Sequence, residues 1–237
     1  MEDTYNIKAI ILNRRPSGEC DSRATVYARE AGKLELTVRG AKKIKSKLAG
    51  HLEPISLTDI MVIRGRRHDY VGAAVSEKCY GDIKNDLAKL PLAARAVRIT
   101  DKLVKPGVAD EKIFELLKDY LAALNAVKGD CEIFFTFFSL KLLTALGHQP
   151  ELSRCLSCVA KVQPGKNRFD LERGGLVCGR CAKPGDGNQS AISDDGIKLL
   201  RLALKCDFEQ LVKVKVNKKL GDEAEKIISS FFKYNFN

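Results

Sequence analysis

Cys155-Leu-Ser-Cys158 and Cys178-Gly-Arg-Cys181 are two Cys-x-x-Cys turns, and nineteen residues separate them. A Cys-x-x-Cys turn directs two thiolates toward one point, and two such turns complete a tetrahedral zinc site. Between the turns, Phe169-Asp-Leu-Glu172 and the Gly174-Gly175 turn predict a short hairpin that leads into the second pair. We therefore expect a zinc module, held by four cysteines, at about residues 152–184.

Two other uses of these cysteines stay open at this point. Paired disulfides are typical of small secreted domains, but the chain starts Met1-Glu-Asp-Thr4, and we expect no secretory signal. A redox pair is expected beside a βαβ pattern, which is not visible in this sequence. Because four thiolates leave no open position for water, the zinc reading predicts one structural Zn²⁺ ion and no zinc chemistry.

Composition narrows the class of protein. At 237 residues and 45% hydrophobic content, the chain can bury one large core or two small ones. The formal net charge of +11 favours a polyanionic partner, nucleic acid before membrane, although a merely well-solvated basic surface would give the same value. No apolar run approaches the roughly 20 residues of a membrane span. The remaining cysteines are scattered and read as reduced apolar fillers, so we expect a reducing cytoplasm: Cys20, Cys79, Cys131 and Cys206.

The first 80 residues or so predict short β-strands. Leu34, Leu36 and Val38 alternate with polar residues, which is the period of a half-buried strand. The predicted strands are 7–12, 23–28, 33–39, 55–63 and 70–75. Five short strands in this length fit a small closed barrel such as the OB-fold. An SH3-like barrel would give a similar pattern, so both barrels remain candidates.

Beyond Tyr80 the hydrophobic period becomes helical. Helices are expected over 87–103, from an N-cap at Asp110, over 132–146, from Ser193, and over 221–236. The helix at 132–146 is apolar nearly all round, which predicts a central position. The expected fold class is therefore α+β: an N-terminal OB-fold barrel at 1–80, followed by an α-helical domain at 81–237 that carries the zinc module.

Two basic segments are candidates for nucleic-acid binding. Residues 39–47 carry positive charges and no acid, and such a segment can follow a phosphate backbone. The hairpin loop at 64–69 is the second candidate. Either could also be a solvated loop that binds nothing. Tyr27 and Tyr70 could stack on bases or belong to the barrel core. The candidate DNA-binding residues are Arg39, Lys42, Lys43, Lys45, Lys47, Arg64, Arg66 and Arg67.

Catalytic motifs are absent from the sequence. The three histidines, His51, His68 and His148, stand alone, and no glycine-rich phosphate loop of the Walker type is present. We therefore expect a protein that is not an enzyme.

Several stretches of this chain resemble the RecO family of bacterial recombination mediators. The most specific is Arg39-Gly-Ala-Lys-Lys-Ile-Lys-Ser-Lys-Leu-Ala-Gly-His-Leu-Glu-Pro54. The approach to the first cysteine pair, Leu146-Gly-His-Gln-Pro-Glu-Leu-Ser-Arg-Cys155, is also similar to the family pattern. The further matching stretches are 8–15, 18–23, 32–34 and 169–175, so the resemblance covers nearly the whole chain.

This resemblance implies a fold and a function. Family members have an N-terminal OB-fold, a helical domain and a zinc module held by that domain. They bind single- and double-stranded DNA and anneal complementary strands. With RecR and the single-stranded-DNA-binding protein, whose C-terminal tail would dock on the helical domain, they help to load the recombinase RecA onto coated single strands. The resemblance thus implies a mediator without enzymatic activity, in the cytoplasm and associated with the nucleoid.

Two other classes of function stay open beside this one. The first is a general nucleic-acid-binding protein, with an OB-fold and a zinc ribbon, that acts in transcription or RNA handling. The second is an enzyme whose site is assembled from residues far apart in the sequence.

Overall fold

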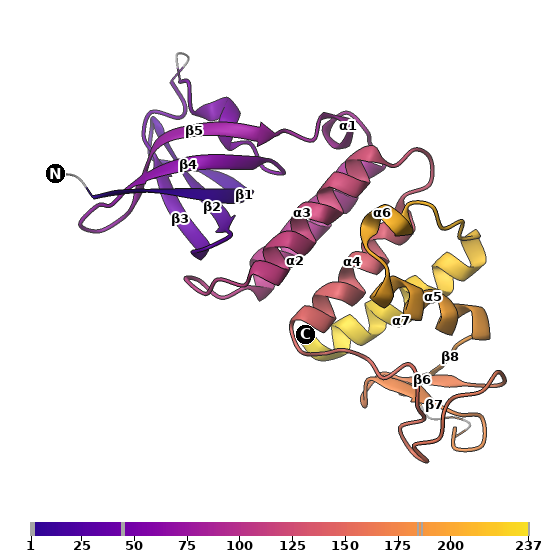
Figure 1. Cartoon of the computed structure of the whole chain (residues 1–237). Helices are drawn as coiled ribbons and strands as arrows, with labels where there is room; N and C mark the ends of the chain where they lie inside the picture. Colours follow the sequence, from indigo (N-terminus) through magenta and orange to yellow (C-terminus); the bar gives the residue numbers. More distant parts are fainter. Residues whose placement is uncertain (1–2, 44–45, 184, 186, 237) are drawn as a thin grey trace. The chain divides into compact units, whose positions relative to one another are not determined.

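The computed structural model describes residues 3–43, 46–183, 185 and 187–236, and Figure 1 shows its elements. The chain forms two compact units, Met1–Ala126 and Val127–Asn237. In the described residues, the first contains a β-barrel, a short 3-10 helix (Ala49–Leu52) and three α-helices, and the second contains the remaining helices and a small sheet.

A closed barrel occupies the start of the first unit. Its strands are β1 (Thr4–Ser17), β2 (Asp21–Ala28), β3 (Gly32–Val38), β4 (Leu57–Ile63) and β5 (Tyr70–Lys78), in the spatial order β1-β2-β3-β5-β4. Strand β1 pairs antiparallel with both β2 and β4, and β3 pairs parallel with β5 at Thr37 and Tyr70. This Greek-key closure is the OB-fold topology, which decides between the two predicted barrels.

Strand β1 is longer than the sequence pattern predicts. Its first part pairs with β4 from Thr4 to Ile10, and its later part pairs with β2 from Ala9 to Ser17. The pairing register shifts between Ile11 and Asn13, which marks a β-bulge. A bulge bends the strand, and this bend lets one strand serve both neighbours.

The predicted alternation in β3 is largely correct. Leu36 and Val38 are buried in the barrel, whereas Leu34 is only partly buried against the same core. Neighbouring strands supply the rest of this core, which includes Ala24, Val26, Ile60 and Val62. Since successive side chains of a strand point to opposite faces, the residues between these positions lie on the outside of the barrel.

Helices α1 (Gly81–Lys84), α2 (Lys89–Leu103) and α3 (Glu111–Ala126) complete the first unit. The predicted N-cap at Asp110 is confirmed, because its Oδ1 accepts hydrogen bonds from the backbone N–H groups of Lys112 and Ile113. Tyr27 of β2 is fully buried, its ring lies 6.5 Å from that of Phe114, and its hydroxyl donates to the carbonyl of Asp110. The barrel and α3 therefore share buried contacts.

The second unit is built around α4 (Glu132–Ala145). As predicted, this helix is central, since most of its side chains are buried and it contacts both α5 (Asp194–Lys205) and α7 (Lys218–Phe236). The Ser193 hydroxyl accepts from the N–H of Gly196, which confirms the predicted start of α5. The short helix α6 (Phe208–Leu211) follows. Among the described helices, none is both long and apolar enough to cross a membrane.

A small sheet also belongs to the second unit. Its strands are β6 (Arg168–Asp170), β7 (Gly175–Val177) and β8 (Gln189–Ala191), in the order β7-β6-β8. The hairpin β6–β7 confirms the predicted one, whereas β8 was not expected. Gln189-Ser-Ala191 lacks the β-branched and aromatic residues that signal a strand.

The division into compact units follows a different line from the predicted domains. Helices α1–α3 group with the barrel in Met1–Ala126, while α4–α7 group with the small sheet. The expected domains at 1–80 and 81–237, with a zinc insert at about 152–184, stay a prediction.

The backbone at Gly32 in the barrel lies very close to the backbone at Val108, between α2 and α3. Gly32 has a φ of 67°, and a Cβ atom there would lie 2.2 Å from the carbonyl oxygen of Val108. Gly18 has a similar φ of 68° but open space around it.

We predict that Gly18→Ala lowers the free energy of unfolding by about 1 kcal/mol through backbone strain. Gly32→Ala should cost a further 1–3 kcal/mol or so because of the clash. Urea unfolding of both variants checks this, and equal losses would contradict the contact.

Candidate metal centre and nucleic-acid interface

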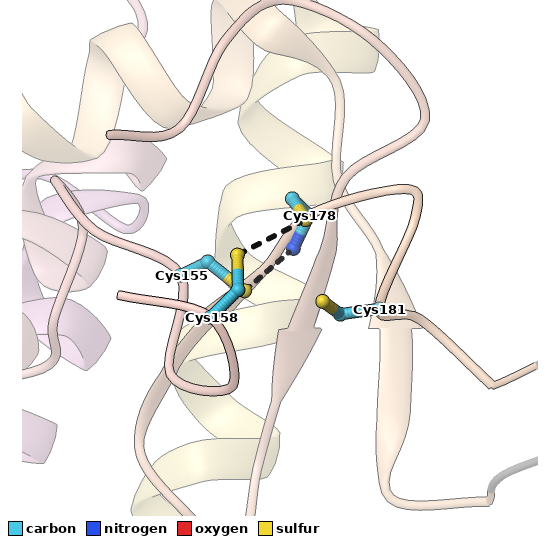
Figure 2. A group of neighbouring side chains, drawn as sticks. All are labelled: Cys155, Cys158, Cys178 and Cys181. Carbon is cyan, nitrogen blue, oxygen red and sulfur yellow. Dashed lines mark hydrogen bonds between the residues drawn. The ribbon is translucent and has the colours of Figure 1, made fainter. Parts of the chain in front are cut away.

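The four predicted cysteines meet at one point in the second unit. One ligand atom from each of Cys155, Cys158, Cys178 and Cys181 lies within 4.8 Å of the other three. Figure 2 shows their side chains pointing toward one another. The sulfurs of Cys158 and Cys178 lie 3.9 Å apart, far beyond the roughly 2.05 Å of a disulfide bond.

Backbone hydrogen bonds shape both turns around these sulfurs. In the first turn, the N–H of Val159 donates to the carbonyl of Cys155, and in the second the N–H groups of Cys181 and Ala182 donate to the carbonyl of Cys178. Val159 has a φ of 61°. For a β-branched residue this conformation costs of order 1–3 kcal/mol. The first turn therefore needs an interaction that holds it, and a bound metal ion would provide one.

The surroundings of the buried Cys155 favour its thiolate form over the thiol. Burial by itself raises the pKa of Cys155, but backbone N–H groups of Cys178, Cys158 and Ser157 interact with its sulfur, and its pKa is lowered to about 6. The pKa of Cys181 is raised to about 12, first by its hydrogen bond with Cys178 and then by Cys158. Four adjacent sulfurs cannot all carry negative charge unless a cation compensates them.

This donor set fits a tetrahedral, thiophilic metal ion. Zn–S bonds of about 2.3 Å in a tetrahedron place sulfurs about 3.8 Å apart, close to the separation of Cys158 and Cys178. The four cysteines can therefore hold a metal ion with only small movements, and they would fill its coordination shell. No position would be left for a reactive water, so a metal ion held there would have a structural role.

Helices α5 and α7 contact the segments that carry the four cysteines. Phe169 of β6 is fully buried, and its ring meets that of Phe231 in α7 edge to face at 5.4 Å. Gly174 has a φ of 66°, and a Cβ there would press against Phe231 at 3.1 Å. Arg201 of α5 donates through two nitrogens to the carbonyl of Leu152, just before the first turn. The cluster is thus fixed to both α5 and α7.

The two basic segments of the first unit approach each other at a single contact. Arg39 follows directly after β3, and Tyr70 begins β5 just after the second basic loop. The guanidinium carbon of Arg39 lies 3.9 Å from the centre of the Tyr70 ring. Because β3 and β5 pair at Thr37 and Tyr70, this contact places the start of the segment 39–47 beside the end of the loop 64–69. The next residues of that segment instead bond to the turn between β1 and β2. The sequence alone did not predict this proximity.

The loop between β4 and β5 is shaped by one acidic residue. Asp69 accepts a hydrogen bond from the Tyr5 hydroxyl at 3.0 Å and another from the N–H of Gly65. Burial and then this bond to Asp69 raise the pKa of Tyr5 to about 12. Arg64 pairs with Asp3 at 3.0 Å and lies over the Tyr5 ring. Asp69 therefore stabilises the conformation of this loop. The charge of Arg64 is partly neutralised by Asp3.

The other predicted basic residues differ in how freely they could meet a phosphate. Lys42 is exposed, and its ammonium donates to the carbonyl of Gly18 at 2.7 Å. Within the described part of the chain, the following exposed residues have no carboxylate partner: Arg39, Lys42, Lys43, Lys47, Arg66 and Arg67. Lys45 lies outside the described residues.

The sequence left two roles possible for Tyr27 and Tyr70, base stacking or barrel core, and the structure places the two residues differently. Tyr27 is fully buried and belongs to the packing between the barrel and α3. Tyr70 is half-buried beneath Arg39. Only Tyr70 is therefore placed where a nucleic acid could reach the stack it forms.

Two further arginines face the outside of the barrel. Arg15 of β1 and Arg23 of β2 are directly opposite in register, and both pair with Glu35 of β3. Sequence reasoning did not select them, because each stands alone in the chain and only the strand register brings them together.

A closed OB-type barrel with a basic edge, joined to a helical unit with a four-cysteine cluster, defines an α+β protein suited to nucleic acid. Two family models match: "Recombination protein O N terminal" over residues 1–75 and "Recombination protein O C terminal" over residues 84–236. The chain therefore belongs to the RecO family, as its sequence motifs indicated. Family membership assigns it a role in DNA repair and recombination.

Curated relatives agree with the family models over most of the chain. A "DNA repair protein RecO" from Desulforamulus reducens is 29% identical over 97% of this chain and 89% of its own. The protein of the same name from Thermoanaerobacter sp. is 27% identical, over 95% of this chain and 90% of its own. That from Roseiflexus sp. is 29% identical, over 97% of this chain and 80% of its own.

Removal of one cysteine tests the metal centre. We predict that Cys178→Ser loses bound metal and lowers the stability of the second unit by several kcal/mol, because metal binding contributes directly to folding. The matched control is Cys79→Ser, an exposed cysteine outside the cluster, which should change neither property. Elemental analysis and thermal unfolding of both variants measure the outcome. Full metal content in Cys178→Ser would rule out the site.

Proposed function

We propose that this protein is a recombination mediator that binds single- and double-stranded DNA and anneals complementary strands. With RecR, it would help to load the recombinase RecA onto single strands coated by the single-stranded-DNA-binding protein. The observation that carries the proposal is the Arg39–Tyr70 contact, which places the start of one exposed basic segment beside the end of the other on an OB-fold barrel. Membership of the RecO family supports the same function.

The proposed chemistry needs no covalent step. Two complementary strands repel each other through their phosphates, and lysine and arginine side chains reduce that repulsion. A surface that holds one strand while leaving its bases accessible therefore accelerates pairing. We infer that the protein is not an enzyme, because charge neutralisation and strand positioning are sufficient for annealing.

The proposed DNA-binding residues are Arg39, Lys42, Lys43, Lys45, Lys47, Arg64, Arg66 and Arg67. Exposure and the lack of carboxylate partners among described residues support most of them, whereas the ion pair of Arg64 with Asp3 weakens its contribution. An OB-fold commonly presents such loops to oligonucleotides.

The proposed metal is one structural Zn²⁺ ion held by Cys155, Cys158, Cys178 and Cys181. Four thiolate donors select a soft or borderline ion with tetrahedral geometry, and zinc is the common choice in proteins. When bound, zinc would fix the two turns to each other and so stabilise the second unit. We assign it no part in DNA chemistry.

The proposed protein partners rest on family membership alone. They are RecR, the C-terminal tail of the single-stranded-DNA-binding protein and, indirectly, RecA. The proposed location is the cytoplasm, in association with the nucleoid. A binding titration with the isolated tail and with RecR tests each partner, and no affinity for either would remove it from the proposal.

Salt dependence tests the first basic segment. If Arg39, Lys42, Lys43, Lys45 and Lys47 each neutralise one phosphate, they should contribute about −3.5 to the log–log salt slope on single strands. We predict that replacing all five with alanine weakens DNA binding and flattens the slope by about this amount. Fluorescence anisotropy at several salt concentrations measures it, and an unchanged slope would reject the segment as the binding site.

Annealing tests the proposed function as a whole. We predict that the protein accelerates pairing of complementary strands coated by the single-stranded-DNA-binding protein, and that RecR changes the outcome. Strand pairing is followed by fluorescence energy transfer between labelled strands. Failure to anneal coated DNA, together with a preference for RNA, would instead favour a general nucleic-acid-binding protein of transcription or RNA handling.

A further inference from the structure

The outer face of the barrel carries one row of residues that crosses four strands. Tyr70 of β5 is paired with Thr37 of β3, Thr37 with Arg23 of β2, and Arg23 with Arg15 of β1. Residues directly opposite in a sheet share a face, so the row begins at the Arg39–Tyr70 stack and ends at two arginines. With strands about 4.8 Å apart, it spans about 14 Å.

The two arginines at the end of this row form an unusual pair. Like charges directly opposite in a sheet are destabilising, and Arg15 and Arg23 occupy such positions. One carboxylate compensates both. Glu35 accepts from Arg15 through Oε2 at 2.6 Å and from Arg23 through Oε1 at 2.5 Å. The cluster thus keeps a net positive charge of one.

The cluster is open to solvent. The exposed fractions of the side chains of Arg15, Arg23 and Glu35 are 59%, 35% and 39%. Each guanidinium has five N–H donors, and within the described chain each uses one in a hydrogen bond, to Glu35. Donors on both arginines therefore remain available to an incoming group.

Glu35 occupies these arginines as a phosphodiester would. A carboxylate and a phosphodiester each carry one negative charge and present two oxygens, and guanidinium groups bind both well. Burial tends to raise the pKa of Glu35, but the hydrogen bond from Arg23 and the charge of Arg15 lower it overall, so the group is ionised at neutral pH. Exposed ion pairs of this kind are weak, so a phosphate of a bound DNA strand can displace the Glu35 carboxylate.

We propose that Arg15 and Arg23 form a further phosphate site for a DNA single strand, and that Glu35 is a built-in competitor for it. The strand would pass from the Arg39–Tyr70 edge along the row, and one of its phosphates would replace the Glu35 carboxylate. This inference rests on the proposed function. Its consequence is that Glu35 weakens DNA binding and keeps a bound strand exchangeable, a useful property for annealing.

Glu35→Gln tests the competitor. The amide keeps the size of the side chain but no longer holds the arginines with a full charge. We predict that this variant binds a short oligothymidine about fivefold more tightly, a limit set by the strength of an exposed ion pair. One more phosphate contact should steepen the log–log salt slope by about 0.7.

Glu77→Gln is the matched control, because it removes the same charge from an ion pair on the same barrel. Glu77 of β5 pairs with Lys8 and is no part of the row. This variant should leave the salt slope unchanged and affect affinity less than Glu35→Gln does. A second control combines Glu35→Gln with Arg15→Ala and Arg23→Ala, and there the gain should vanish. Urea unfolding of each variant separates binding effects from loss of the fold.

The outcomes distinguish this inference from the function on which it rests. Equal effects of Glu35→Gln and Glu77→Gln on affinity and slope would overturn the phosphate site while leaving DNA binding intact. A gain that persists without the two arginines would overturn it as well. If the unaltered protein binds no single-stranded DNA, the proposed function fails first and the inference fails with it.

Discussion

The parallel pairing of β3 with β5 at Thr37 and Tyr70 is the contact on which the proposed nucleic-acid surface depends. It closes the barrel, and it is the only parallel ladder in the described barrel. Through it, Arg39 reaches the Tyr70 ring, and the start of the segment 39–47 lies beside the end of the loop 64–69. The same pairing starts the row that leads to Arg23 and Arg15. If this closure opened, the positive charges would remain but their common surface would be lost.

The four-cysteine cluster has a different physical role from the barrel edge. Its surroundings, Phe169 against Phe231 and Arg201 on Leu152, are the contacts of a packed structural module. The dense basic segments belong to the other compact unit. We therefore infer that the cluster stabilises α5, α7 and the small sheet, and that strand binding is carried by the barrel.

Local patterns predicted what depends on local chemistry. The N-caps at Asp110 and Ser193, the hairpin before Cys178 and the meeting of four cysteines all follow from spacing and residue type. Strand register does not, because it is set by the bulge in β1 and by pairing between distant strands. For this reason the Arg15–Glu35–Arg23 cluster and the Arg39–Tyr70 stack were not predictable, and the barrel type stayed open until the β3–β5 pairing was known.

The most direct test of the central claim is to map where a single strand touches the protein. Photo-crosslinking of a short oligonucleotide, followed by mass spectrometry of the peptides, gives this map. We predict crosslinks at the barrel edge, in the peptides around Arg39 and Tyr70, and few at the four-cysteine cluster. Crosslinks concentrated between Cys155 and Cys181, with none at the barrel edge, would contradict the account.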